Sequence, residues 1–556
     1  MDKVSSKTRL ENICAGRAAY ALLCLSVIIA YSSVWPNSFV FDDRALIVGN
    51  QFLRRWGDLP KLLTSLNFSG FGTDRQGFYR PIPMLLHFFV YQAFGLSTQA
   101  FHAVNIALQA LNACLLCRFG QRSGFKKGVA FSAALLWAVH PLFTEAVAYM
   151  SSTPELLGGT FCLLGLTALL PDFTPRRIWR AAAFYLLALG TIETSVVFPA
   201  LAAATFFFMN ETRIDIRAYR KMWPLWLMAA LYIAAWLVYM HVSGYNMNGA
   251  MQGVTDPRFP AYATSILHRT LTALATLPVY LGLILWPHGL HMERLFPVFT
   301  SLLHPLPAAG ALMVALAFLQ IYTGRAKRGL ALSFGLIWFG IAFSPMTGIL
   351  FPVNALVSEH WMYLPLMGLA LGVLETVAEF LEGKRAIALV TLAALAFGAV
   401  TFQQCKVWRD PETLYRNIVE NGGNRYRISE DVAYYYMEHH DFNKAIPQFA
   451  WLTAHTFGRS VPWLTGMHML AANAWLEARM DKNGVVTLAE INRTLAGSTP
   501  TRVAQAVSQL NDALALTPDF LWARIYLLQI YRHQGNTAMA ALQEEKIKSL
   551  GRKAPE

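Results

Sequence analysis

Two adjacent carboxylates, Asp42 and Asp43, stand in the stretch FVFDDR at residues 39–44, directly after the first long apolar segment. A carboxylate can take a proton from a hydroxyl group as that hydroxyl attacks an electrophilic centre, so the pair is a candidate for general base catalysis. The alternative is structural, because Asp is a common helix N-cap and favours the helix dipole. A short amphipathic helix is expected directly after the pair.

Further polar residues gather at the ends of apolar segments, on what the basic clusters of the chain indicate to be one side of a membrane. Acids near the bilayer midplane would be typical of an ion transporter, whereas acids at helix ends favour an enzyme site at the water interface that serves a lipid-borne substrate. Each residue also has a structural alternative as a helix cap, an interfacial carboxylate or a member of an aromatic belt. The candidates are Tyr79, Arg80, His102, Asn105, His140, Glu145, Glu155, Glu193, Glu359, His360 and Tyr363.

The composition predicts an all-α, polytopic membrane protein. Of the 556 residues, 55% are hydrophobic and 14% are charged, against about 25% charged in soluble proteins. The net charge of +13 comes from short Lys/Arg clusters between apolar segments, which argues against a nucleic-acid partner. About eleven segments have the length and the charged ends of transmembrane helices, namely 18–35, 101–119, 128–143, 155–170, 178–192, 195–209, 222–241, 306–323, 329–347, 361–378 and 385–403.

The basic clusters set the expected orientation. The basic N-terminus precedes a retained signal anchor, and five later clusters fall on the same side, which is therefore cytoplasmic. They are Arg118–Lys127, Arg176–Arg180, Arg213–Lys221, Arg325–Arg328 and Lys384–Arg385. This places the loops 37–99 and 242–305 and the C-terminus on the external side.

Two apolar stretches are expected not to cross. The run Ile82–Leu96 is predicted to lie along the membrane interface. The run Ile266–Trp286 must stay on one side, since a crossing there would invert everything after it, and Pro278 and Pro287 are compatible with a broken or re-entrant segment.

The character of the chain changes after Arg409, where about 145 residues read as helical and polar. A 34-residue helix-turn-helix register fits Ala506, Ala513, Pro518, Gly535 and Ala540, and Tyr436, Phe442 and Ala445 suggest an earlier, degenerate copy. We therefore predict a membrane domain over 1–408 and a tetratricopeptide-like (TPR-like) helical domain over 409–556. The register is not held over 455–500.

The six cysteines predict neither a disulfide framework nor a metal site. Cys114 and Cys117 form a C-x-x-C inside an apolar helix, without a second ligand pair. No cluster of ligands calls for a metal, and no cofactor is expected.

Several strings of the sequence resemble the membrane-embedded glycosyltransferases of the C superfamily (GT-C). They are closest to the transmembrane, tetratricopeptide-repeat O-mannosyltransferases and their bacterial relatives. The resemblance extends over nearly the whole chain. It is carried by FVFDD at 39–43, YRP at 79–81, FHAVN at 101–105, HPLFTEAVAYMSSTPELL at 140–157, VNALVSEHWMYLP at 353–365 and KVWRDPETLY at 406–415.

The resemblance implies a polyprenyl-phosphate-linked monosaccharide as donor, a Ser or Thr hydroxyl of an exported protein as acceptor, and Asp42 or Asp43 as catalytic base. Adjacent residues on a turn cannot both point at one atom, so we expect Asp42 to be the base and Asp43 to orient sugar or peptide. It also implies inverting transfer, acceptor binding in part by the TPR-like domain, and a bacterial inner membrane.

The chain departs from the family pattern at three cations, since Thr153 and His360 stand in place of Arg and Ile192 in place of Lys. A phosphate leaving group needs fixed cations rather than an acid catalyst. Arg80, Arg269, Arg294 and His360 are the remaining candidates, with Arg80 favoured because its planar fork matches phosphate oxygens.

The missing cations leave a second hypothesis open, a non-catalytic membrane-anchored TPR scaffold. Within the enzyme hypothesis, the acceptor could instead be a pilin-type protein, or a glycan or lipid of the cell envelope. A transporter is disfavoured by the lack of charge within the helices.

Overall fold

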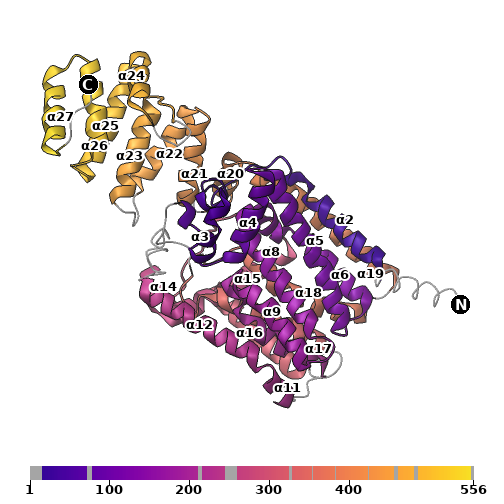
Figure 1. Ribbon diagram of the computed structural model, residues 1–556. Helices are drawn as coiled ribbons and strands as arrows, with labels where there is room; N and C mark the ends of the chain where they lie inside the picture. Colours follow the sequence, from indigo (N-terminus) through magenta and orange to yellow (C-terminus); the bar gives the residue numbers. More distant parts are fainter. Residues whose placement is uncertain are drawn as a thin grey trace. The chain divides into compact units, whose positions relative to one another are not determined.

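The computed structural model is all-helical in its described residues, which are 16–71, 78–210, 216–243, 259–324, 329–353, 355–381, 383–423, 425–455, 461–480 and 486–551 (Figure 1). Several predicted features lie outside this described part, among them Cys14, the N-terminal basic residues up to position 15, Arg213, Arg325, Lys327 and Arg328. The chain divides into two compact units, with the division after Gly423.

The first unit consists of long apolar helices. Every one of the eleven segments predicted to span the membrane contains a helix at the expected place. The helices longer than ten residues are α2 (Arg17–Tyr31), α4 (Pro81–Phe94), α5 (Thr98–Arg122), α6 (Lys127–Ala138), α8 (Thr153–Leu169), α9 (Pro175–Leu189), α10 (Phe198–Met209), α12 (Trp223–Ser243), α15 (Ile266–Leu285), α16 (Pro305–Thr323), α17 (Leu330–Phe343), α18 (Tyr363–Phe380) and α19 (Lys384–Gln404).

Seven helices in the described residues are long and apolar enough to cross a membrane by themselves, or eight if the bent pair formed by 127–138 and 141–148 counts as one span. Six of the eleven predicted spans pass this test alone, α6 passes as part of the bent pair, and α8, α9, α10 and α12 do not pass. The seventh helix that passes is α15, which was predicted not to cross. A span needs about 20 residues at 1.5 Å rise per residue. The protein is a multi-pass helical membrane protein, as the composition predicts.

Shorter helices connect these elements and carry much of the candidate site. They are η1 (Ser32–Val34), η2 (Arg44–Val48), η3 (Gln51–Leu53), η4 (Trp56–Asp58), α3 (Leu59–Thr64), η5 (Ser69–Phe71), η6 (Pro141–Phe143), α7 (Thr144–Ala148), η7 (Met150–Ser152), η8 (Glu193–Val197), α11 (Ile216–Lys221), α14 (Phe259–Thr264), η9 (Ser344–Thr347), η10 (His360–Met362), η11 (Cys405–Trp408) and α20 (Pro411–Glu420).

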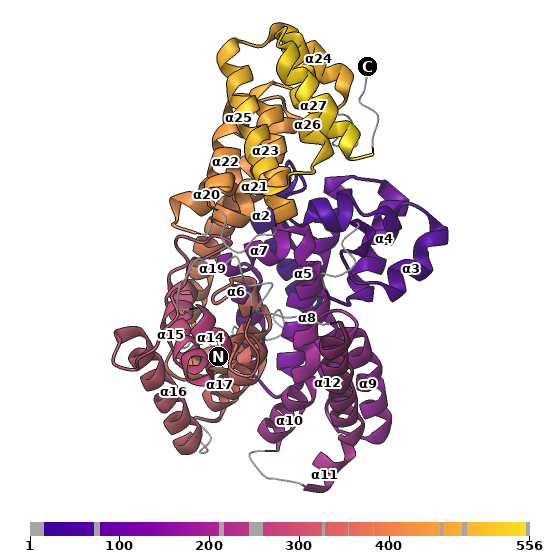
Figure 2. The same ribbon diagram turned by 90° about the vertical axis from the view of Figure 1, so that its left-hand side faces the viewer.

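In the first unit, helices that are far apart in the sequence pack against each other, as do helices that follow one another. The first span α2 contacts α5, α6 and the last span α19, and these four lie side by side in Figure 1. On another flank α9 packs against α8 and α12, as Figure 2 also shows. The hydroxyl of Ser33, in the turn that follows α2, donates to Phe402 O of α19 at 2.5 Å and so joins two helices from opposite ends of this unit's sequence.

Glycine allows α17 and α18 to approach closely. The ring of Trp338 lies so near Gly368 that a Cβ added there would be 2.1 Å from it. One turn further on, a Cβ at Gly372 would lie 2.4 Å from the carbonyl oxygen of Ala331. Small residues at a helix interface permit such backbone contact in membranes, where packing rather than the hydrophobic effect holds helices together.

The segment 266–286 forms the single continuous helix α15, with Pro278 inside it, so the broken segment expected from the prolines is not observed. It passes the length and composition test for a span. Its contacts nevertheless follow connections on the predicted external face: Arg269 Nε donates to Ile349 O at 3.0 Å, Tyr280 Oη donates to Ser358 O at 3.1 Å, and Ile284 O lies 3.0 Å from His140 Nε2. These contacts support a helix that lies along that face, and its failure to cross stays a prediction.

The second unit is an array of antiparallel helices from residue 425 onward. Its helices are α21 (Arg425–Glu438), α22 (Phe442–Ala454), α23 (Val461–Trp475), α24 (Leu488–Gly497), α25 (Pro500–Leu516), α26 (Leu521–His533) and α27 (Thr537–Ser549). Ala506, Ala513 and Ala540 of the predicted 34-residue register are buried in its core, and Gly535 makes the turn between α26 and α27 with φ +67°. The predicted boundary at Arg409 falls earlier than the observed division because α20 belongs to the first unit.

Candidate functional site

The segment 140–155 is the part of the chain on which the predicted site residues meet. It contains η6, α7 and η7 and leads into α8. Two acids of this segment, Glu145 and Glu155, lie close to His360, and two other residues, Tyr149 and Ser151, hold the loop that carries Asp42 and Asp43. One short stretch therefore contacts the first loop and the connection before α18.

Asp43 is fully buried, and its carboxylate is occupied by hydrogen bonds. Oδ1 accepts from the backbone N–H of Ser151 at 2.8 Å and from its hydroxyl at 2.5 Å, and Oδ2 accepts from Val40 N at 3.1 Å. Burial raises the pKa of Asp43 from 3.8 to about 7, although these hydrogen bonds oppose the shift. Asp43 stands at the N-cap position of η2 without a side-chain capping bond, so the helix-cap alternative is wrong for this residue.

Asp42 is partly exposed, and its backbone is anchored to the same segment. Its N–H donates to the hydroxyl oxygen of Tyr149 at 3.0 Å, and its carbonyl accepts from Leu46 N at 2.8 Å. The preceding residue, Phe41, has φ +52°, a conformation that is uncommon for a residue with a side chain and that concentrates at functional sites. The expected amphipathic helix after the pair is the single turn η2, with Leu46 and Ile47 buried.

Four glutamates and three basic side chains form ion pairs near this segment. Arg80 grips Glu193, with Nε 3.1 Å from Oε1 and Nη2 2.7 Å from Oε2. His360 Nδ1 lies 2.9 Å from Glu145 Oε1, and its Nε2 lies 3.8 Å from Glu155 Oε1.

The third pair joins Arg294 and Glu359, with Arg294 Nη2 at 3.0 Å from Glu359 Oε1. The same oxygen accepts from His291 N at 2.8 Å. Burial raises the pKa of Glu359 to about 8, and the nearby charge of Glu145 adds to this shift while Arg294 opposes it. The predicted cations Arg80, Arg294 and His360 are therefore all engaged by carboxylates.

Arg269 differs from these three cations in the partners that are seen for it. Nε and Nη1 donate to the carbonyl oxygens of Ile349 and Ala263, at 3.0 and 2.9 Å. No described carboxylate forms an ion pair with it, although the residue is 93% buried. Helices η8, which begins with Glu193, and η9, which ends just before Ile349, contact each other. Arg269 and the Arg80–Glu193 pair thus belong to neighbouring connections.

Two of the predicted residues, His140 and Asn105, have structural contacts. His140 caps η6, since its Nδ1 accepts from Leu142 N at 3.2 Å. Asn105 accepts from the hydroxyl of Thr153 at 2.9 Å and donates to Val147 O at 3.2 Å. The Arg expected from the family at position 153 is thereby replaced by a short hydroxyl side chain that is 2% exposed.

Tyr363 belongs to a buried polar network between helices rather than to the ring of ion pairs. Its hydroxyl accepts from Asn112 Nδ2 at 2.8 Å and donates to Gln109 Oε1 at 2.6 Å. Asn112 also donates to Leu156 O and accepts from Thr160, which joins α5, α8 and α18. We therefore do not carry the donor-binding role of Tyr363 into the proposed site.

The two remaining candidates lie apart from the ion pairs. Tyr79 is 52% exposed, and its hydroxyl donates to Leu63 O at 2.8 Å. His102 is fully buried in α5. Neither shows a contact with the acids above, and their roles in binding stay predictions.

The sequence did not single out Tyr149, Ser151 and Trp408, although all three lie in the strings that carried the resemblance. Aromatic rings and a serine hydroxyl are common in proteins and do not by themselves indicate a site. The only signal in the sequence was that these residues stand in the same strings as the candidate acids. Trp408 stacks on Tyr149 with ring centroids 5.2 Å apart and planes at 19°.

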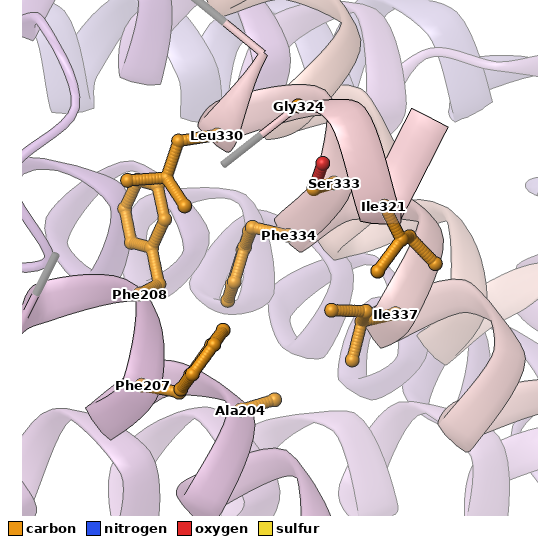
Figure 3. Close-up of a pocket in the computed structure, with 9 residues that line it drawn as sticks. All are labelled: Ala204, Phe207, Phe208, Ile321, Gly324, Leu330, Ser333, Phe334 and Ile337. Carbon is orange, nitrogen blue, oxygen red and sulfur yellow. The ribbon is translucent and has the colours of Figure 1, made fainter. Parts of the chain in front are cut away.

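An apolar pocket lies between α10, α16 and α17 (Figure 3). It holds about 170 Å³, and the rings of Phe208 and Phe334 approach each other there with centroids 4.7 Å apart. Ser333 is polar, but its hydroxyl donates to Gly329 O at 2.9 Å. The lining contains none of the site residues and no charged side chain, so the pocket is separate from the acidic loop and the ion pairs. Among the described residues, no group of three or more His, Cys, Asp or Glu side chains could hold a metal ion, and metal independence stays a prediction.

Comparison with known proteins identifies relatives of one kind. No family model matches the chain. The human protein O-mannosyl-transferase TMTC1 is 34% identical over 174 residues, which are 30% of this chain and 19% of that protein. Over longer stretches, Tmtc3 of Drosophila melanogaster is 25% identical across 63% of this chain and 45% of its own length, and mouse TMTC4 is 23% identical across 73% of this chain and 63% of its own length. The matches thus span less than two thirds of each of these relatives.

Among solved structures, ArnT from Cupriavidus metallidurans is similar at a low level. In the apo state it has a TM-score of 0.36 and 15% identity over 95% of this chain and 78% of its own. Bound to undecaprenyl phosphate, it has a TM-score of 0.38 and 14% identity over 91% of this chain and 81% of its own. These values are too low to assign a role to any residue. The resemblance to the transmembrane, tetratricopeptide-repeat O-mannosyltransferases that the sequence motifs predicted is confirmed by the sequence relatives, since the proteins to which this chain is similar are named protein O-mannosyl-transferases.

Proposed function

We propose that this protein is a membrane glycosyltransferase that moves a monosaccharide from a polyprenyl phosphate to a Ser or Thr hydroxyl of an exported protein. The observation that carries the proposal is the contrast between the two carboxylates of the first loop. Asp43 is fully buried and accepts three hydrogen bonds, whereas Asp42 is partly exposed and held by its backbone. Asp43 thus has the contacts of a residue that shapes the loop, and Asp42 has the exposure of a residue that can meet a substrate.

The proposed reaction is a single displacement with Asp42 as general base. The acceptor hydroxyl oxygen forms a bond to the anomeric carbon while the bond from that carbon to the phosphate oxygen breaks. The hydroxyl proton passes to Asp42, and the polyprenyl phosphate leaves with the bonding electron pair. Attack opposite the leaving group inverts the anomeric configuration. A correctly placed base contributes about 10²- to 10⁴-fold to the rate of such a step.

The leaving phosphate requires cations, which we assign to Arg80 and Arg269. Glu193 takes Nε and Nη2 of Arg80, and the carbonyls of Ile349 and Ala263 take Nε and Nη1 of Arg269. Each guanidinium group therefore keeps one amino group for a ligand. An anion left unpaired in a partly desolvated pocket would cost several kcal/mol, so at least one of these cations must contact the phosphate.

His360 is assigned a supporting role, because its two ring nitrogens face Glu145 and Glu155. A protonated His360 would neutralise part of the negative charge of these glutamates and so lower the repulsion felt by an incoming phosphate. The carboxylate oxygens that remain are acceptors for sugar hydroxyls. This assignment keeps Glu145, Glu155 and Glu193 as donor-binding residues.

The acceptor and the cellular location are proposals as well. The helical array from residue 425 onward is proposed to bind an extended segment of the acceptor protein, and the membrane is proposed to be the inner membrane of a bacterium. A pilin-type protein, or a glycan or lipid of the cell envelope, is an alternative acceptor. The relatives named above are protein O-mannosyl-transferases by name, which favours a protein.

One observation favours the scaffold hypothesis, in which the chain transfers no sugar. Arg80, Arg294 and His360 are all occupied by glutamates, as expected of a membrane domain that only has to fold. A partly exposed acid beside the strained backbone of Phe41 is more typical of a functional site than of a scaffold, and for that reason we prefer the enzyme.

The test is a transfer assay with the purified full-length protein in liposomes. A panel of synthetic polyprenyl-phosphate hexoses and pentoses is offered with Ser/Thr-containing peptides, and products are read by mass spectrometry. Transfer by the wild type that Asp42→Asn abolishes would support the enzyme. Absence of transfer from every donor, together with unchanged glycosylation of exported proteins in cells that lack the protein, would favour the scaffold.

A further inference from the structure

The loop that carries Asp42 is fastened to the C-terminal end of the last membrane helix. Just before the acidic pair, Asn37 Nδ2 donates to Cys405 O at 2.9 Å, and Ser38 donates to Arg409 O through its N–H at 2.8 Å and its hydroxyl at 3.0 Å. Because residues 37 and 405 are 368 positions apart in the chain, this contact exists only in the assembled helix bundle.

A second contact reaches Asp42 through two aromatic rings. The ring of Trp408, which is 3% exposed, stacks on the ring of Tyr149. The hydroxyl oxygen of Tyr149 accepts the N–H of Asp42, and the ring of Phe41 lies 6.4 Å from that of Tyr149 at an angle of 48°. Asp42 is thus held at its backbone by a tyrosine whose own ring is fixed from behind by Trp408.

The backbone at Phe41 is strained, so the contacts around it have to hold it in this conformation. A non-glycine residue at φ +52° is strained and persists only where its surroundings fix it. The turn around Phe41 is fixed by several hydrogen bonds, among them Arg44 N–H to Phe41 O at 3.1 Å and Val40 N–H to Asp43 Oδ2 at 3.1 Å. The bond from Asp42 N–H to Tyr149 is the contact that joins the backbone of Asp42 to the stack, so without it Asp42 could turn from its present direction.

We infer that Tyr149 and Trp408 are positioning residues for the proposed base, so that the end of the last membrane helix sets the direction of the Asp42 carboxylate. Neither residue is assigned a contact with sugar, phosphate or acceptor. The inference rests on the proposed function. It adds that the aromatic stack, rather than the acidic loop by itself, determines how fast the hydroxyl proton is removed.

The test measures kcat and KM for the full-length protein in liposomes with the most active synthetic donor. Tyr149→Phe keeps the ring and removes the acceptor of the Asp42 N–H, and Trp408→Leu removes the stack. We expect each to lower kcat by about tenfold to hundredfold, because a displacement of about 1 Å can have this effect, with the KM for the donor unchanged. Trp408→Phe keeps an aromatic ring behind Tyr149 and is expected to restore most of the rate.

Two controls separate positioning from a loss of folding. Trp338→Leu removes an equally buried ring from the contact of α17 with α18, away from the site, and should lower protein yield without changing kcat. The double variant Tyr149→Phe/Trp408→Leu should lose little more than either single variant, since both act on the same group.

The experiment distinguishes a failure of the positioning role from a failure of the proposed function. If the wild type transfers sugar and Asp42→Asn does not, but Tyr149→Phe and Trp408→Leu retain wild-type kcat, the positioning role is overturned and the proposed base survives. The positioning role is also overturned if the kcat losses of the two single variants multiply in the double variant. It is overturned as well if the variants lose only protein yield, as Trp338→Leu does. A wild type without any transfer would overturn both proposals.

Discussion

Ser151 donates both its backbone N–H and its hydroxyl to one carboxylate oxygen of Asp43, at 2.8 and 2.5 Å. These bonds join the first loop to the segment between α7 and α8, more than a hundred residues further along the chain. Two neighbouring acids thereby acquire different tasks, since the buried one connects two loops and the partly exposed one can meet a substrate.

Replacement of the two acids should have different effects. Asp42→Asn keeps the shape of the side chain but cannot accept a proton, so we expect transfer to fall by about 10²- to 10⁴-fold while the protein still inserts and accumulates. Asp43→Asn should retain more of the rate but lose about 1–3 kcal/mol of stability, because an amide NH₂ would face the buried N–H of Val40. Transfer assays and thermal denaturation in detergent measure the two effects. The assignment is wrong if Asp42→Asn stays close to the wild-type rate, and Asp43 is then the next candidate base.

The raised pKa of Asp43 predicts how stability depends on pH. Its folded pKa of about 7 lies above the ordinary value of 3.8, so between these values the folded protein keeps a proton that the unfolded chain has lost. Stability should therefore fall as pH rises from about 4 to 7, and the contribution of Asp43 should level off above that range. Glu359, with a pKa of about 8, acts in the same direction.

A comparison of variants isolates the contribution of Asp43. In Asp43→Asn the decline between pH 4 and 7 should be shallower than in the wild type by up to about one bound proton, while the part due to Glu359 persists. Denaturation midpoints measured across this range would show it. Parallel curves for the two proteins would mean that Asp43 is ionised throughout.

Substitution of Arg80 tests the assignment of the phosphate. Arg80→Ala should raise the KM for the lipid donor at least tenfold, because a guanidinium fork that faces the leaving group is lost. The same change leaves Glu193 without its partner, so the double variant Arg80→Ala/Glu193→Gln serves as the matched control. Donor KM is measured with saturating acceptor for both variants. If the double variant recovers wild-type donor KM, Arg80 only neutralised Glu193, and Arg269 becomes the principal cation.

His360→Arg should be tolerated or improve transfer at neutral pH. Burial opposes the charged ring, but the adjacent carboxylate of Glu145 raises the pKa of His360 to about 9, so the wild-type ring already carries a charge there. An Arg there would supply a permanent positive charge between Glu145 and Glu155, where His360 supplies one only when protonated. Rates measured from pH 8 to 10 should accordingly vary less in the variant than in the wild type, because only the wild-type ring loses its charge in that range. A rate loss comparable to that of His360→Ala would show that the ring itself, and not its charge, is needed.

The side of the membrane on which the helical array lies can be tested at Lys546, an exposed residue of α27. A cysteine placed there, in a variant otherwise free of accessible cysteines, should react with a membrane-impermeant reagent added from outside, since an even number of predicted crossings separates it from Asp42. Cysteine at position 44 provides the reference for the external side. Labelling at 546 only after access to the cytoplasm would mean that α15 crosses the membrane.

The helices were predictable from the sequence because each apolar run has to satisfy its backbone hydrogen bonds internally in a membrane. The shape of α15 was not, since Pro278 suggests a break, but a helix that packs against α16 and the external connections tolerates it. The division after Gly423 differs from the predicted boundary at Arg409 because α20 contacts η11, and a change in composition does not reveal such a contact.

The sequence suggested a set of candidate residues but not the contacts between them. The acids could be collected on one side from basic clusters and helix ends alone. Their pairing with Arg80, Arg294 and His360 depends on side chains up to 215 positions apart, as between His360 and Glu145, and no local pattern encodes such pairs. Tyr149 and Trp408 were not predicted for the same reason, because they act through a stack between two segments that are far apart in the sequence.

The polar network of Asn112, Gln109 and Tyr363 has a consequence for the synthesis of the protein. Asn112 meets Leu156 and Thr160 soon after α8 is made, but the hydroxyl of Tyr363 is encoded 251 residues after Asn112 and 254 after Gln109. At roughly 5–20 residues per second, a nascent chain would hold the helix pair α5 and α8 in the bilayer for about 10–50 s before α18 could complete the network. During that interval Gln109 Nε2 can donate to Ala138 O of α6, but Gln109 Oε1 lacks the Tyr363 hydroxyl from which it accepts in the folded protein, so α5 waits for α18 with one acceptor in the bilayer unsatisfied by that partner.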